Sequence, residues 1–192
     1  MELIRQRIRE SIDVKERILK DDKILKIIQN ISKLIIKAFR NDKKMFLCGN
    51  GGSAADAQHI AAELSGRFYL DRKPLFAEAL HVNTSYLTAV ANDYSYEKVF
   101  SRLVEAKGRP GDILIGISTS GNSKNVIEAM EVANKIGMIT IGLTGNTGGK
   151  MAYICKYCVK VPSTDTPRIQ EAHILIGHII CEVVEKELFS EK

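Results

Sequence analysis

The sequence contains no uninterrupted apolar run long enough to cross a membrane and no block of basic residues. Its 28 Lys and Arg and 23 Asp and Glu give a net charge of +5 that is spread along the chain. Nucleic-acid binding predicts clustered Lys and Arg, so this pattern favours a mild attraction for small anionic substrates. Charged and apolar residues alternate from Glu2 onward, which predicts no signal peptide. We expect a cytoplasmic protein with neither a nucleic-acid nor a membrane partner.

Cysteine is scarce: the chain has four, Cys48, Cys155, Cys158 and Cys181. Most lie in apolar segments, which is typical of reduced, buried thiols. Cys155 and Cys158 form a C-x-x-C, but a structural zinc site needs a second ligand pair, and a thioredoxin-like site places the motif at the start of a helix. Here the segment continues into Val159–Pro162, whose pattern predicts a strand. We therefore interpret the pair as two ordinary thiols.

The first 40 residues are predicted to be helical. Ile4, Ile8 and Ile12 recur with a period of four, and a second isoleucine stripe begins at Ile24. Asp21-Asp22 marks the junction and is expected to cap the second helix. The polar faces carry both signs of charge, so the stripes are interpreted as faces for core or subunit packing.

From residue 43 onward the pattern alternates between strand and helix. Strands are predicted at Met45–Cys48, Leu75–Leu80, Asp112–Ile117, Met138–Leu143 and Ile154–Val161. Helices are predicted from the end of the first strand to about Leu64 and at Ser85–Ala91, Glu97–Ala106, Val126–Ile136 and about Arg168–Leu188. Continuous apolar strands that alternate with helices predict a parallel sheet covered on both faces. Ligands of such sheets bind beyond the carboxyl ends of the strands, at a topological switch point. The length of 192 residues suits one domain.

The loop after the first strand is the most informative segment. Its sequence, Cys48-Gly-Asn-Gly-Gly-Ser53, stands between a strand and a helix, where glycines let an anion approach unpaired backbone N–H groups. Gly49, Gly51 and Ala54 also satisfy the dinucleotide pattern G-x-G-x-x-A. The acidic residue that this pattern requires would be Glu78, which comes late and falls inside a strand. A dinucleotide site therefore remains the weaker alternative.

The second loop, Ser118-Thr-Ser-Gly-Asn-Ser123, carries four hydroxyl groups at a strand-to-helix turn. Hydroxyl groups so arranged can donate hydrogen bonds to several oxygens of one phosphate. An N-cap alone would account for one serine, but it accounts poorly for four hydroxyls in six residues. We favour a phosphate site.

Two predicted helices carry candidate acid–base groups. His59 and Glu63 are four residues apart and share a face of an alanine-rich helix, just inside the first loop. On the C-terminal helix, spacing alone pairs Glu171 with His178, whereas Gln170 and His178 are about 80° apart. A lone histidine on an apolar helix is usually a core residue, so the residues alone leave the role of His178 open.

Taken together, Cys48–Glu63, Ile117–Ser123 and Arg168–His178 resemble the phosphoheptose isomerases of the sugar isomerase (SIS) superfamily, and the similarity extends over nearly the whole chain, including Asn92-Asp93. The resemblance implies a flavodoxin-like three-layer α/β/α fold with a central parallel sheet. It implies a single SIS domain over residues 1–192, with residues 1–40 packing on the domain and between subunits. It also implies a homotetramer whose active sites lie at subunit interfaces.

The resemblance assigns residue roles by position. It implies Glu63 and His178 as the catalytic pair. The implied substrate-binding residues are Asn50, Gly51, Gly52, Ser53, Glu63, Asn92, Asp93, Ser118, Thr119, Ser120, Ser123 and Gln170. The implied ligands of one zinc ion per subunit are His59, Glu63, Gln170 and His178. Pro167 is a departure, because some relatives carry Asp there.

The implied reaction converts sedoheptulose 7-phosphate into D-glycero-D-manno-heptose 7-phosphate through an enediol, in heptose biosynthesis for surface polysaccharide. This aldose–ketose isomerisation needs a carboxylate base and a partner acid. The alternative is a non-catalytic SIS protein that binds the replication initiator, but such relatives lack the glutamate and the second histidine. A sugar-phosphate-sensing regulator is a third possibility, for which the chain offers no DNA-binding extension.

Overall fold

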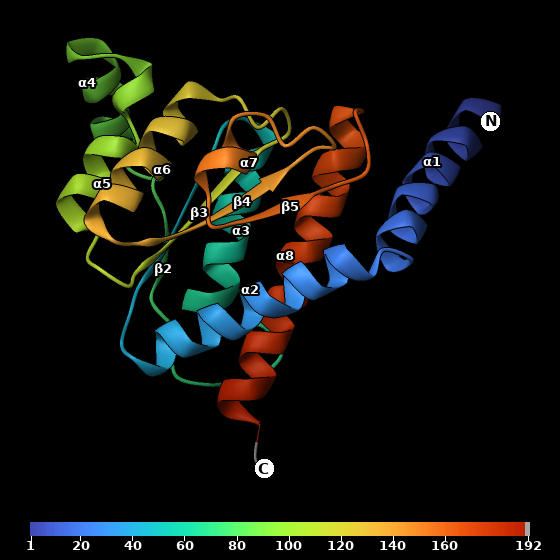
Figure 1. The fold of residues 1–192 in the computed structure, drawn as a ribbon, viewed down its shortest axis with the longest axis horizontal. Helices are drawn as coiled ribbons and strands as arrows, with labels where there is room; N and C mark the ends of the chain where they lie inside the picture. The colour runs from blue at the N-terminus through green and yellow to red at the C-terminus, as the bar shows by residue number, and fades with distance from the viewer. Residues whose placement is uncertain (191–192) are drawn as a thin grey trace.

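Five parallel strands form a single sheet in the computed structural model, which describes residues 1–190 (Figure 1). The strands are β1 (Met45–Gly49), β2 (Ala77–Ala79), β3 (Ile113–Ser118), β4 (Ile139–Thr144) and β5 (Tyr157–Lys160). Their order is β2-β1-β3-β4-β5, and every neighbouring pair is parallel. The chain leaves β1 toward one edge and returns to add β3 on the other side. This order is the flavodoxin-like one, so the predicted fold class is confirmed and the switch point lies between β1 and β3.

Helices cover both faces of the sheet and bury a separate apolar cluster on each. One face is covered by α2 (Asp22–Arg40), α3 (Gly52–Ser65) and α8 (Thr166–Phe189). The other is covered by α4 (Thr84–Asp93), α5 (Ser101–Lys107), α6 (Lys124–Ile136) and the short α7 (Met151–Ile154). The strands between them are apolar on both faces, as expected of a parallel sheet.

The N-terminal segment forms the two expected helices, α1 (Glu2–Leu19) and α2. The Asp21 carboxylate caps α2 by accepting hydrogen bonds from the N–H groups of Lys23 and Ile24, at 2.9 and 3.2 Å. The isoleucine stripe of α2 is buried against the sheet. In contrast, α1 projects away from the sheet (Figure 1) and leaves Ile4 and Ile8 more than half exposed. Within residues 1–190, no helix combines the length and apolarity needed to cross a bilayer.

Three predicted elements differ from the structure. The strand expected at Ile154–Val161 is wrong at its start, because α7 ends at Ile154 and β5 begins only at Tyr157. A four-residue helix is too short to produce a periodic pattern. The helix expected at Glu97–Ala106 begins as a 3₁₀ turn, Tyr96–Lys98, and continues as a separate α5. The edge strand β2 is shorter than expected.

A buried ion pair fastens the loop after α3 to α8. Arg72 Nε lies 2.9 Å from the Glu185 carboxylate, and each side chain is at most 3% exposed. Glu185 also accepts hydrogen bonds from the backbone N–H groups of Phe68, Tyr69 and Leu70. Burial alone would raise the pKa of Glu185, but these donors and Arg72 together lower it. The loop is thus ordered around a charged carboxylate.

Replacing Arg72 with methionine should destabilise the protein by about 3–5 kcal/mol, because Glu185 would remain buried without its countercharge. Urea unfolding followed by circular dichroism measures this difference. Arg40→Met is the matched control: Arg40 also pairs with a glutamate of α8, Glu187, but both side chains are about half exposed, at 52%. We expect the control to lose less than about 1 kcal/mol. Equal losses would show that the Arg72 pair is no stronger than a surface pair.

Candidate active site

The two loops noted in the sequence leave the sheet side by side. Gly49 at the end of β1 is in register with Ile117 of β3, so the loops that follow these two strands begin at the same end of the sheet. Gly51 has φ +54°, a backbone conformation that favours glycine, and stands at the N-cap of α3. Gly121 occupies a similar conformation, φ +66°, before α6. The sequence thus places two helix N-termini at the switch point, where anions bind.

Asn50 joins the first loop to the helix that follows the second. Its side-chain amide exchanges two hydrogen bonds of 2.9 Å with the amide of Asn125, at the start of α6. The Tyr96 hydroxyl also donates to Asn50 Oδ1, at 3.1 Å. Asn50 therefore has structural partners besides its predicted role, and Asn125 and Tyr96 are site residues that no sequence signal indicated.

The second loop concentrates its hydroxyl groups as predicted. Ser118 Oγ lies 2.8 Å from Ser123 Oγ and 3.4 Å from Ser120 Oγ. Ser118 is buried, whereas Thr119 and Ser123 are partly exposed and Ser120 is exposed. Hydroxyl groups can turn their protons toward an anion, so this cluster at the N-terminus of α6 can bind phosphate oxygens.

A cavity of about 290 Å³ opens beside this loop. It is lined by Thr119, Ser120 and Asn122 of the second loop and by polar residues that follow β4 and β5. These further residues are Asn146, Thr147, Ser163, Thr164 and Thr166, with Ile169 as the apolar member. A cavity lined by hydroxyl and amide groups suits a polyhydroxylated ligand, because each ligand hydroxyl can both donate and accept hydrogen bonds.

His59, Glu63 and His178 form one cluster at the contact between α3 and α8. His59 Nε2 lies 3.1 Å from Glu63 Oε1 and 3.5 Å from His178 Nε2. The two imidazole rings meet edge to face, with their centroids 4.9 Å apart. The His59 and Glu63 side chains are 49% and 22% exposed, so the cluster is accessible. The structure therefore unites the predicted catalytic pair with the predicted first metal ligand.

This cluster fits a zinc ion. One nitrogen or oxygen ligand atom from each of the three residues lies within 4.8 Å of the others. Tetrahedral zinc with bonds of about 2.0–2.2 Å separates its ligand atoms by about 3.3–3.6 Å. The contacts of 3.1 and 3.5 Å match that spacing, and two histidines with one glutamate are a common catalytic zinc set.

The cluster depends on a close approach of α3 and α8. A Cβ atom on Gly177 would lie 2.5 Å from Ile60 Cδ1, the residue after His59. At the other end of the contact, a Cβ atom on Gly52 would lie 2.5 Å from Gln170 Nε2. Two glycines thus let the helices touch. Gln170 lies beside the first loop, eight residues before His178, which is about 12 Å along a helix.

Other predicted residues lie outside this cluster. Ser53 is buried in the first turn of α3. Asn92 and Asp93 are exposed at the end of α4, where Asn92 donates to Asp93 at 2.9 Å. Glu171, which the helical wheel paired with His178, instead pairs with Arg168 at 2.6 Å. Pro167 lies in the first turn of α8, where its missing N–H costs no helical hydrogen bond.

Residues next to the cluster support it. Arg72, from the buried ion pair, donates to the carbonyl oxygens of Glu63 and Leu64, which end α3. The Phe68 ring lies 5.8 Å from the His178 ring. Asp56, one turn before His59, is partly buried, and burial raises its pKa to about 6 while His59 opposes that shift. Asp56 could have been noticed in the sequence, because it is a charged residue among the alanines of this helix.

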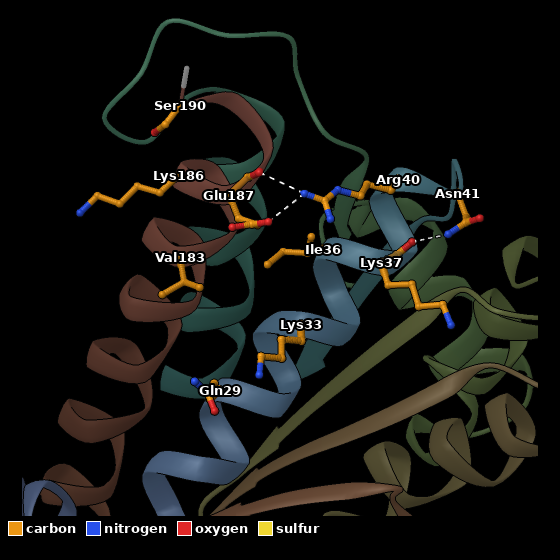
Figure 2. A pocket seen from close by; sticks show the side chains of 10 residues that line it. All are labelled: Gln29, Lys33, Ile36, Lys37, Arg40, Asn41, Val183, Lys186, Glu187 and Ser190. Carbon is orange, nitrogen blue, oxygen red and sulfur yellow. Dashed lines mark hydrogen bonds and ion pairs between the residues drawn. The ribbon is translucent and has the colours of Figure 1, made fainter. Parts of the chain in front are cut away.

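A larger pocket, of about 820 Å³, lies away from both loops (Figure 2). It is formed by α2 and the end of α8, where Arg40 bonds to Glu187. Its rim carries the exposed amines of Lys33, Lys37 and Lys186. It contains no residue of the cluster, so we assign no catalytic role to it.

Comparison with known proteins identifies the family. The SIS domain family profile matches residues 8–145. A phosphoheptose isomerase of Aneurinibacillus thermoaerophilus is 56% identical over 189 residues, which are 98% of this chain and 96% of that protein. Phosphoheptose isomerase 2 of Campylobacter jejuni is 58% identical over 182 residues, 95% of this chain and 90% of that protein. The chain belongs to the phosphoheptose isomerase family of SIS-domain proteins.

A solved structure agrees. The phosphoheptose isomerase of Neisseria gonorrhoeae superimposes with a TM-score of 0.91 at 45% identity, covering 96% of this chain and 98% of that one. The match includes residues on both sides of the switch point and the long helix α8. The family assignment thus rests on sequence and fold together.

Gly177→Ala should weaken zinc binding by roughly tenfold, because the added Cβ forces α3 and α8 apart beside His59 and His178. Competition against a chromophoric chelator measures the affinity. Ile60→Ala in the same chain removes the colliding atoms, so the double variant should recover most of the affinity. An unchanged affinity in Gly177→Ala would show that this helix spacing does not set the cluster.

Proposed function

We propose that the protein isomerises sedoheptulose 7-phosphate to D-glycero-D-manno-heptose 7-phosphate, in heptose biosynthesis for surface polysaccharide. The observation that carries this proposal is the His59–Glu63–His178 cluster on helices that begin beside a hydroxyl-rich loop. The names of the relatives support the same reaction. Residues 1–190 are also free of any disulfide, which suits the predicted cytoplasmic location.

Glu63 serves as the base that moves the proton between C1 and C2 of the sugar. His178 exchanges the proton of the adjacent oxygen, so that the enediol forms and collapses without a free alkoxide. His59 stands between these two groups, within 3.5 Å of both, and holds them in place. Arg72 fixes the end of α3 through the Glu63 carbonyl, which limits the freedom of the base.

Zinc is the metal that the donor set fits, with His59, Glu63 and His178 as ligands from one chain. When bound, the ion polarises the sugar carbonyl as a Lewis acid. Gln170, the predicted fourth ligand, lies beside Gly52 in the same chain. Since that position is about 12 Å from His178 along α8, we infer that the fourth ligand is Gln170 of a second copy.

The phosphate is held by the second loop. Ser118, Thr119, Ser120 and Ser123 supply hydroxyl donors, and the N-terminus of α6 adds its partial positive charge. The first loop, with Asn50, Gly51, Gly52 and Ser53, lies beside it, and His59 follows Gly52 by about 10 Å along α3. The reacting carbons and the phosphate are at opposite ends of the sugar, so the His59–Glu63–His178 cluster must lie at a distance from the phosphate-binding loop. Asn92 and Asp93 complete the proposed substrate set.

We infer that residues 1–192 form one SIS domain that assembles as a homotetramer. The apolar stripe of α1, at Leu3, Ile4, Ile8 and Ile12, is 49–61% exposed in a single chain. Such a stripe is typical of a subunit contact. Residues 1–40 would then pack both on the domain and between subunits, and active sites at subunit interfaces would explain the exposure of His59 and the position of Gln170.

A non-catalytic SIS protein that binds the replication initiator is less well supported. A binding protein needs neither a carboxylate nor a second imidazole at the α3–α8 contact. The chain has Glu63 and His178 there, within one cluster. The names of the relatives also favour the enzyme over the binding protein.

Glu63→Gln should lower kcat by roughly 10²–10⁴-fold, because an amide cannot accept the carbon proton. Purified protein is incubated with sedoheptulose 7-phosphate, with and without added zinc, and the aldose product is measured. Glu182→Gln is the matched control: Glu182 lies on α8 one turn after His178, paired with the exposed Lys186. We expect this control to keep the activity of the unmodified protein.

Two outcomes would overturn the assignment. Full turnover by Glu63→Gln would exclude Glu63 as the base. Absence of any heptose phosphate with the unmodified protein, across zinc-supplemented and chelator-treated samples, would exclude the isomerase and favour the binding protein.

A further inference from the structure

Cys155 and Cys158 are brought together by the fold at a place that the proposed reaction does not use. Cys158 lies in β5, the last strand of the sheet, and Cys155 follows α7 at a bend just before that strand. Cys158 is in register with Gly142 of β4. Since Gly142 has no side chain, the space above it on that face of the sheet is free for sulfur.

Both thiols fill this space. A Cβ atom on Gly142 would lie 3.1 Å from Cys155 Sγ and 3.5 Å from Cys158 Sγ. The backbone of the C-x-x-C is therefore not a continuous strand. The bend before β5 lets the side chains of both cysteines point to the same side of Gly142. Two cysteines that share a contact in this way are candidates for a disulfide.

The surroundings distinguish the two sulfur atoms. The neighbouring Cys155 thiol, the Thr144 hydroxyl and Lys160 lower the pKa of Cys158, and burial only partly opposes them. Thr144 Oγ1 lies 3.5 Å from Cys158 Sγ. The same contact raises the pKa of Cys155. Cys158 is therefore the better nucleophile, and Cys155 is placed to attack the Cys158 sulfur once that sulfur is oxidised.

The other two cysteines differ. Cys48 and Cys181 are both 0% exposed, and burial raises the pKa of each to about 12. Cys155 and Cys158 are each partly exposed, beside an edge strand. Within this chain, partial exposure and a lowered pKa thus coincide at Cys158, with a second partly exposed thiol, Cys155, beside it.

We propose that Cys155 and Cys158 form a dithiol that hydrogen peroxide oxidises to an intramolecular disulfide and that small thiols reduce again. The Cys158 thiolate attacks one peroxide oxygen, the O–O bond breaks, and the leaving hydroxide takes up a proton as water. The Cys158 sulfenic acid is then attacked by Cys155 sulfur, the S–O bond breaks, and the second hydroxide leaves with the Cys155 proton as water. The two thiols lose two electrons in total, and the peroxide gains them.

The sequence itself supplies the assay. Lys156 lies between the two cysteines, so trypsin separates Met151–Lys156 from Tyr157–Lys160. The full-length protein is treated with hydrogen peroxide, alkylated, digested without reductant and analysed by mass spectrometry. We expect the two peptides to appear covalently linked and to separate again after dithiothreitol. The link should form under conditions in which Cys48 and Cys181 can still be alkylated after unfolding.

Single variants separate the two roles. Cys158→Ser should slow the loss of the remaining thiol of the pair by roughly tenfold. Cys155→Ser should react as fast as the unmodified protein but stop at a sulfenic acid that dimedone traps. Circular dichroism verifies that both variants are folded, and a denaturing gel without reductant tests whether the link is within one chain.

Three results would overturn the proposal: no linked peptides at peroxide concentrations that oxidise free cysteine, a dimer on the non-reducing gel in place of an internal link, or equal oxidation of Cys48 and Cys181. Each is independent of the isomerase assay, because none of these cysteines lies among the proposed catalytic or binding residues.

Discussion

The close contact between α3 and α8 is the constraint on which the candidate site depends. Gly177 lies against Ile60, and Gly52 lies against Gln170, in both cases at distances that leave no room for a Cβ atom. This contact brings His178 to His59 and Glu63, which are 115 or more residues away in the sequence. Without it, His59 and Glu63 would be an ordinary helix-surface pair.

The rest of the structure holds these two helices in place. The sheet order fixes where α3 begins, because β1 lies between β2 and β3 and ends at the switch point. The buried pair of Arg72 and Glu185 connects the end of α3 to α8 and sets Phe68 beside His178. Helix α3 thus connects the switch point, where the N-terminus of α6 also lies, to the His59–Glu63–His178 cluster. This arrangement suits a substrate with a phosphate at one end and a carbonyl at the other.

Much of this could be predicted from the sequence, for physical reasons. The buried strands carry continuous apolar runs, and the two loops stand directly after them, so the fold class and the meeting of the two loops at one end of the sheet follow from pattern and composition. The partner of Glu63 could not be predicted in this way. Helical spacing favours a pairing of Glu171 with His178. In the structure, however, Glu171 forms an ion pair with Arg168, and His178 contacts His59 of the neighbouring helix. Periodicity describes one helix and carries no information about its neighbour.

The same limit applies to the C-x-x-C. Its sequence context favoured two unremarkable thiols, whereas their contact above Gly142 depends on a short helix and a bend that leave no periodic signal. Local pattern thus predicts elements well and contacts between elements poorly.

The most direct test of the central claim is anomalous X-ray scattering at the zinc edge, from crystals grown with zinc. We predict one strong peak per chain, about 2.0–2.2 Å from His59 Nε2, His178 Nε2 and the Glu63 carboxylate, with Gln170 of a second copy as the fourth ligand. A peak at any other residues, or no peak at the contact between α3 and α8, would contradict it.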